Sequence, residues 1–136
     1  MKYLCFRVGD EWYGIDVTQV IEVLHFVALH HIPGSRPEVL GLLTLREVTM
    51  PVIDMRVRFQ ADSADLSLDT PIIATHTPHG IVGLVVDDVD DVEEIFNISD
   101  HHAHESPFIN GSSRVGDRLV LIVDISQFRE NELLQA

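Results

Sequence analysis

The stretch VLGLLTLREVTMPVIDMRVRF, residues 39–59, constrains the fold more than any other part of the sequence. It is the most apolar long segment, yet Gly41 and Pro51 exclude one continuous helix, because proline lacks the amide hydrogen and its ring clashes with the preceding turn. The sequence therefore predicts two strands, Leu40–Leu45 and Val48–Asp54, that pair as a hairpin.

The two residues between these strands, Arg46 and Glu47, form the predicted corner of the hairpin. A charged corner at the rim of a packed sheet presents a cation that a partner can reach. The alternative is an ordinary buried hairpin with charged ends, in which Arg46 makes an internal salt bridge with Asp54 or Glu47. The two interpretations are compatible, and both stay open.

The length of 136 residues and the hydrophobic content of 46% predict one globular domain that buries a core without metal or disulfide support. The single cysteine, Cys5, cannot form an internal disulfide, which suits a reducing cytoplasm. We interpret it as a small core residue of a strand. The apolar run in Met1–Val8 is too short for a signal peptide or a membrane span, so we expect a soluble cytoplasmic protein without membrane insertion.

The charge balance is strongly acidic, with nine Lys and Arg residues against 22 Asp and Glu residues and a formal net charge of −13. Nucleic acid and anionic membranes would repel such a protein, so nucleic acid is not an expected partner. The charge favours partners with basic patches.

Several further segments predict strands. Tyr3–Val8 alternates between two faces and precedes Gly9-Asp10, a pair that two-residue type II′ turns favour, before Trp12–Ile15 returns. Pro71–Asp88 repeats the hairpin signature, and Leu119–Val123 is apolar on both faces, as in a central strand. Short strands at regular spacing predict an all-β fold with short helices, either a small barrel or a sandwich.

Two short helices are expected beside these strands. Capping-box spacing begins at Asp16, and four apolar residues follow at helical spacing: Val17, Val20, Ile21 and Leu24. Val23–Val27 fits a strand equally well, and the periodicity does not decide between the two. Asp124–Gln127 predicts the cap of a C-terminal helix that buries Ile125, Phe128 and Leu133. In Asp87–Ile95 the apolar residues recur every three positions, but the Val and Asp content favours bulged strands.

The remaining segments are predicted loops. Residues 60–70 are polar and acidic without apolar spacing, and we expect a mobile linker there. Asn97–Arg114 is loop-like except for a short strand at Pro107–Ile109.

The sequence contains no motif for nucleotide binding, nucleophilic catalysis or redox chemistry, so it predicts no enzyme activity and no cofactor. One histidine cluster, His101, His102 and His104 beside Glu105, has side chains that could bind Zn²⁺ in a metal-binding protein or enzyme. Solvated loop histidines are the alternative, since Phe108 stands where a zinc-protease motif needs histidine. The acidic run at residues 87–94 lacks calcium-loop spacing and predicts a solvated face.

Six short motifs follow one another along almost the whole chain. They are F-x-x-G-x-x-x-Y-G-I-D-V at 6–17, V-x-E-V at 20–23, G-x-x-x-L-R at 41–46, P-V-I-D-M-R at 51–56, G-L-V-V-D-x-V at 83–89 and D-R-L at 117–119. In this order and spacing they resemble the CheW-like domain of bacterial chemotaxis coupling proteins. The resemblance implies a single domain over residues 1–136, built from two small five-stranded SH3-like barrels packed on a shared hydrophobic core.

The resemblance also implies a non-catalytic adaptor at membrane-associated receptor arrays. Such adaptors connect the cytoplasmic tip of methyl-accepting chemoreceptors to the regulatory domain of a CheA-type histidine kinase, and a groove between the barrels receives the receptor tip. By position, Val20 and Glu22 match residues that contact partners, and Gly41 and Arg46 match residues tied to receptor coupling and kinase control. Thr44 and Glu47 complete the expected protein-binding set.

The chain departs from the family at this corner. Where the family usually has Asn-Leu-Arg-Gly, this sequence has Thr44-Leu45-Arg46-Glu47. Glycine serves a corner with φ > 0, so either the corner has another conformation or Glu47 accepts strain. A scaffold of a divergent signalling, motility or polar-localisation system, without ordinary receptor coupling, is the alternative within the same fold.

Overall fold

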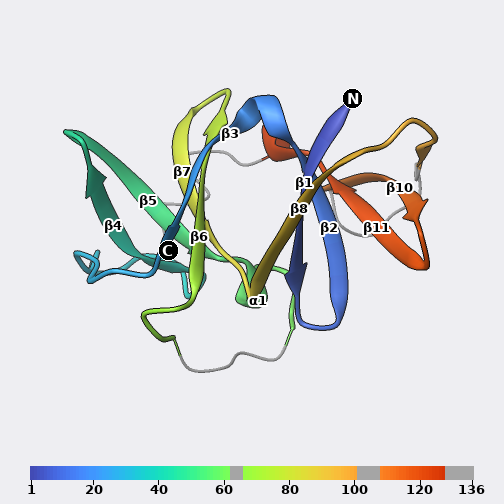
Figure 1. Ribbon diagram of the computed structural model, residues 1–136. Helices are drawn as coiled ribbons and strands as arrows, with labels where there is room; N and C mark the ends of the chain where they lie inside the picture. The colour runs from blue at the N-terminus through green and yellow to red at the C-terminus, as the bar shows by residue number, and fades with distance from the viewer. Residues whose placement is uncertain (62–65, 101–107, 128–136) are drawn as a thin grey trace.

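The strands of the computed structural model form two groups, which we call lobe 1 and lobe 2 (Figure 1). The structure describes residues 1–61, 66–100 and 108–127. Lobe 1 contains β1 (Lys2–Val8), β2 (Glu11–Asp16), β8 (Asp88–Glu94), β9 (Ser99–Asp100), β10 (Ile109–Val115) and β11 (Arg118–Val123). Lobe 2 contains β3 (Val20–His25), β4 (Val39–Leu45), β5 (Val48–Asp54), β6 (Pro71–Thr77) and β7 (Gly80–Val85). Three short helical turns complete the described elements: a 3-10 helix Val17–Gln19, α1 (Met55–Arg58) and a 3-10 helix Ile125–Gln127.

Both lobes have the same strand arrangement. The order β8-β1-β2-β11-β10 in lobe 1 corresponds to β3-β6-β7-β5-β4 in lobe 2, and each sheet has one parallel pair, β2 with β11 and β5 with β7. In lobe 1, β8 leads along the chain into β9, which pairs with β10 and joins the two ends of the sheet. In lobe 2, His30 pairs with Leu42 of β4 and joins the ends in the same way. The predicted all-β fold of two small barrels is confirmed, with five strands in the lobe 2 sheet and six in the lobe 1 sheet.

A shared hydrophobic core lies between the lobes. Strand alternation points Leu4 and Phe6 of β1 toward this core, where they pack with Ile53, Ile73 and Leu84 of lobe 2. On the opposite face of β1, Tyr3 and Cys5 line the interior of the lobe 1 barrel. Cys5 is only 1% exposed, and burial raises the pKa of its thiol to about 11. Cys5 is therefore a core residue, as predicted.

A buried arginine joins the lobes through two carboxylates. Arg56 in α1 donates to both oxygens of Asp54, over 3.0 Å from Nε and 3.1 Å from Nη2, and Asp54 also caps α1. The Nη1 of Arg56 lies 3.6 Å from an oxygen of Asp87, in the segment that leads into lobe 1. Asp87 in turn accepts a 2.7 Å hydrogen bond from the backbone amide of Gly9, in the β1–β2 turn. The hydrogen bond with Asp54 is the main cause that raises the pKa of Arg56, so this buried group stays charged.

Two predictions about local structure are wrong. The helix expected after Asp16 is only the 3-10 helix Val17–Gln19. Val20–His25 forms β3 instead, so the strand alternative for Val23–Val27 holds in part. The Asp16 side chain does accept a hydrogen bond from the backbone amide of Thr18, as a helix cap would. Beyond that turn, pairing with β6 outweighs the helical pattern of the sequence. The loop expected over most of Asn97–Arg114 contains β9 and most of β10, whose polar sequence INGSSRV lacks alternating apolar residues.

Other predictions are confirmed or lie partly outside the described residues. The bulged strand expected near Asp87–Ile95 is β8, whose register against β1 shifts once. At the C-terminal end the structure describes only Ile125–Gln127, so Phe128 and Leu133 of the expected helix lie outside it. Of the expected 60–70 linker, residues 62–65 also lie outside it, and mobility there stays a prediction. No helix among the described residues is long and apolar enough to cross a membrane.

We predict that Arg56→Met lowers the free energy of unfolding by about 3 kcal/mol, because it leaves the buried Asp54 carboxylate and its neighbour Asp87 without their cation. Urea denaturation followed by circular dichroism measures the change. The control is Arg114→Met on the exposed surface of β10, which should change stability by about 0.5 kcal/mol or less. Equal effects of the two substitutions would contradict the role of Arg56.

Candidate functional site

The β4–β5 hairpin ends in a two-residue turn made by Arg46 and Glu47. Leu45 pairs with Val48, and the turn residues have φ values of 47° and 69°. Type I′ hairpin turns require positive φ at both central residues, where a side chain costs roughly 1–2 kcal/mol per residue. The predicted corner is confirmed, and Glu47 accepts the positive φ that glycine would adopt freely.

An ion pair connects this turn to the opposite edge of the sheet. Arg46 donates from Nη1 to a carboxylate oxygen of Glu22 in β3. Because β3 and β4 are the two end strands of the lobe 2 sheet, the pair spans the seam of the barrel. The arginine side chain is 72% exposed and the glutamate side chain 28% exposed. The hydrogen bond that Arg46 donates to Glu22 raises the pKa of Arg46, and the guanidinium remains accessible from outside.

The prediction that Arg46 pairs internally with Asp54 or Glu47 is wrong. Neither Asp54 nor Glu47 pairs with it, since Asp54 binds Arg56 and the partner is Glu22. The sequence contained no signal for this pairing, because Glu22 and Arg46 meet only when the sheet curls and its end strands approach each other.

Gly41 lies behind the hairpin at the closure of the barrel. The backbone amide of Leu42 donates to His30 O over 2.7 Å, and the amide of His30 donates to Leu42 O over 2.9 Å. Gly41 has a φ of 151°, and a Cβ there would lie 2.6 Å from His30 O. Gly41 is buried, so it sets the position of the hairpin and has no exposed side chain to offer a partner.

Two exposed valines mark the edge of the shared core, one in each lobe. Val23 of β3 pairs with Ile73, and Val92 of β8 pairs with Leu4, so both point to the side of these core residues. Their side chains are nevertheless 42% and 45% exposed. We call Val23 and Val92 the apolar rim. Sequence alternation could not identify them, because it does not show which edge strands remain uncovered.

The other expected residues fall into two environments. Val20 is half-buried and packs against the shared core, beside the seam that Glu22 spans. Thr44 is exposed, and its hydroxyl lies 2.9 Å from that of Thr49 on the neighbouring strand. The structure therefore brings Glu22, Thr44, Arg46 and Glu47 to the accessible hairpin region of lobe 2. Gly41 is buried at the closure of that barrel, and Val20 is half-buried against the shared core.

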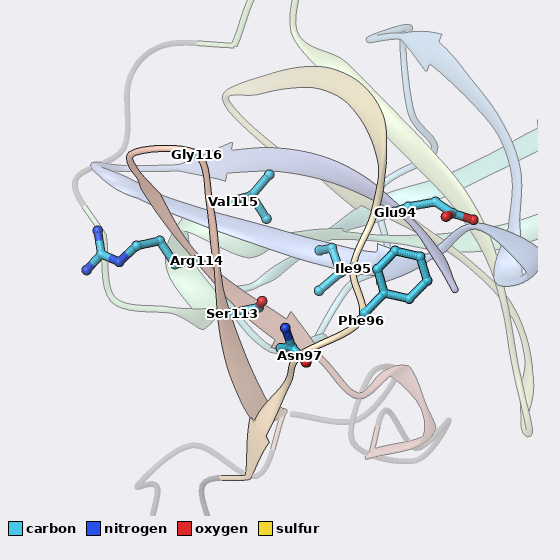
Figure 2. Close-up of a pocket in the computed structure, with 8 residues that line it drawn as sticks. All are labelled: Glu94, Ile95, Phe96, Asn97, Ser113, Arg114, Val115 and Gly116. Carbon is cyan, nitrogen blue, oxygen red and sulfur yellow. The ribbon is translucent and has the colours of Figure 1, made fainter.

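A separate shallow cleft lies in lobe 1, between residues 94–97 and 113–116 (Figure 2). Ile95 and Val115 face each other across it, whereas the Glu94 and Arg114 side chains point to opposite sides. Ser113 comes from β10, and the Glu94 carboxylate points away from it. The described residues that line the cleft therefore do not form the paired nucleophile and base that nucleophilic catalysis needs.

His101, His102, His104 and Glu105 lie outside the described residues. Among residues 1–61, 66–100 and 108–127, no group of three or more His, Cys, Asp or Glu side chains is arranged to hold a metal ion.

Comparison with known proteins agrees with this architecture. The family model for the CheW-like domain matches residues 2–132. The chain belongs to the CheW-like family. It is 29% identical to the chemotaxis protein CheW of Klebsiella aerogenes over 137 residues, which cover 96% of this chain and 82% of the relative. It is 34% identical to the chemotaxis protein CheW of Bacillus subtilis over 91 residues, which cover 67% and 58%.

The fold matches a solved CheW-like structure as well. The crystal structure of the scaffolding protein TtCheW from Thermoanaerobacter tengcongensis superposes with a TM-score of 0.89 at 28% identity, and the match covers 98% of this chain and 96% of that one. The CheW-like fold expected from the sequence motifs is thus confirmed, with both lobes present.

We predict that Gly41→Ala destabilises the protein by at least about 2 kcal/mol, because it combines positive φ with a contact that the paired backbone of His30 cannot relieve. The control is Gly80→Ala, which has a φ of 127° but no atom within 4 Å of the added Cβ. Urea denaturation of both variants separates the cost of the backbone conformation from that of the contact. A Gly41→Ala cost no greater than that of Gly80→Ala would contradict the contact.

Proposed function

We propose that this CheW-like chain is a non-catalytic adaptor of chemotaxis signalling that works in the cytoplasm at receptor arrays. It joins the cytoplasmic tip of chemoreceptors to the regulatory domain of a CheA-type histidine kinase. Family membership supports the adaptor role. The observation that carries the proposal is the Arg46–Glu22 pair, a charged group held at an accessible seam of lobe 2.

The kinase regulatory domain binds at the hairpin of lobe 2 in this proposal. Arg46 presents a planar guanidinium whose remaining donors can form bidentate contacts with a carboxylate. Glu22 holds that guanidinium over the seam, so less side-chain freedom is lost on binding than for an unpaired arginine. Gly41 contributes by setting the hairpin position, and Val20 supports Glu22 from the core side.

The receptor tip binds along the apolar rim in this proposal. Val23 and Val92 come from corresponding edge strands of the two lobes and border the shared core. An amphipathic helix buries apolar side chains in such a position. Because Glu22 and Val23 are neighbours on one strand, β3 contributes to both partner surfaces from its two faces.

We predict that Arg46→Glu and Glu22→Lys each weaken binding to the kinase regulatory domain of the same genome tenfold or more, equal to about 1.4 kcal/mol. Isothermal titration calorimetry measures the affinity. The control is Arg114→Glu on lobe 1, which should leave the affinity unchanged. In the Arg46→Glu/Glu22→Lys double variant the internal pair is restored with reversed charges. Weak binding by the double variant would show that the partner recognises the sign of each charge. Recovery of the affinity would show that the pair acts by holding the hairpin in place.

Failure of the wild-type chain to bind any such domain would overturn the adaptor proposal and favour a scaffold of a divergent system. Unchanged affinity in both single variants would instead place the kinase surface elsewhere.

We predict that Val23→Asp and Val92→Asp weaken binding to a receptor cytoplasmic fragment about tenfold, because each places a charge in a contact that must lose water. Affinity for the kinase domain should stay within twofold. The matched control is Val48→Asp, which changes a valine of similar exposure, 40%, on the hairpin. Fluorescence anisotropy with a labelled receptor fragment measures the effect, and an equal loss in the control would argue against the rim.

A further inference from the structure

The turn at the tip of the hairpin is built from residues that its backbone disfavours. Both Arg46 and Glu47 have positive φ, which glycine and, to a lesser degree, asparagine adopt readily. Arg46 gains an internal partner in Glu22. Glu47 is exposed and makes no hydrogen bond or ion pair with any residue that the structure describes.

Nothing in the described part of the chain therefore offsets the conformational cost of a side chain at position 47. Residues held in sparsely populated backbone conformations concentrate at binding sites, where the strain serves an external contact. The tip also carries an unbalanced charge, since it holds one guanidinium, that of Arg46, and two carboxylates, those of Glu22 and Glu47. A docked protein would meet a net negative tip whose free group is the Glu47 carboxylate.

We propose that Glu47 determines which partner docks on the hairpin, by pairing with a lysine or arginine on that partner. This inference rests on the proposed function, in which the hairpin contacts the kinase regulatory domain. A partner that presents only a carboxylate toward Arg46 would also meet Glu47, and this like-charge contact would disfavour it. A partner with a cation opposite Glu47 and a carboxylate opposite Arg46 satisfies both side chains.

The test compares three substitutions at one position. Glu47→Gly removes both the strain and the charge, Glu47→Gln keeps the strain and removes the charge, and Glu47→Asp keeps the charge. Glu47→Gly should keep or raise Tm, by up to roughly 4 °C, because glycine adopts the positive φ without strain. The rise is limited because glycine also has more conformational freedom in the unfolded chain. Calorimetric titration with the kinase regulatory domain of the same genome should give affinities at least threefold weaker for the Gly and Gln variants and within twofold of wild type for the Asp variant.

Salt and a distant charge serve as controls. The loss caused by Glu47→Gln should shrink in 0.5 M NaCl, because exposed ion pairs are screened. Asp69→Asn, which removes an exposed carboxylate from the turn before β6, should leave affinity unchanged. A stabilised Glu47→Gly variant that binds more weakly would support the proposal, because lost stability could not explain lost affinity.

The outcomes separate this inference from the function on which it rests. Wild-type affinity in Glu47→Gly, together with weak binding by Arg46→Glu, would overturn the role of Glu47 and leave the adaptor standing. Weak binding by Glu47→Gly but wild-type affinity in Glu47→Gln would assign the effect to hairpin geometry and also overturn it. No binding by the wild-type chain would overturn both.

Discussion

The two-lobed structure depends on Arg56, which lies between carboxylates of different segments. Hydrophobic burial drives the lobes together but is not directional, so many relative placements would bury similar area. A buried cation is tolerated only where its hydrogen bonds are satisfied, and this requirement is directional. Asp54 satisfies one side of the guanidinium, and Asp87 links the other to the β1–β2 turn of lobe 1 through Gly9. The network thus selects one placement among those that the apolar core allows.

That placement decides which strand faces remain accessible. β3 and β8 occupy corresponding ends of the two sheets, and both contribute partly buried valines to the shared core and exposed valines to its edge. On the other face of β3, Glu22 meets the hairpin tip across the barrel seam. One edge strand therefore connects a charged surface with an apolar one. A displacement of β3 caused by one partner would therefore also move the other surface.

The sequence was sufficient for local features and insufficient for those that depend on barrel closure. The β4–β5 hairpin was predictable because Gly41 and Pro51 exclude a helix and only two residues separate the strands. The first half of β3 was predicted as helix and its second half was left open, because the apolar spacing fits both structures; pairing with β6 decides for the strand. β10 was missed because it packs through small residues: a Cβ at Gly111 would lie 2.6 Å from Ile98. The ion pair of Arg46 with Glu22 joins opposite sheet edges, which no local pattern specifies.

The order of segments along the chain has a consequence for folding. Lobe 2 is continuous in sequence, whereas lobe 1 combines β1 and β2 with β8–β11, which follow only after all of lobe 2. Pairing of β1 with β8 and of β2 with β11 closes a long loop, whose entropy cost must be met before those contacts form. We expect lobe 2 to act as the folding template: its formation brings the two halves of lobe 1 together. During synthesis, the edges of β1 and β2 that pair with β8 and β11 would remain without their partners until those later strands have left the ribosome.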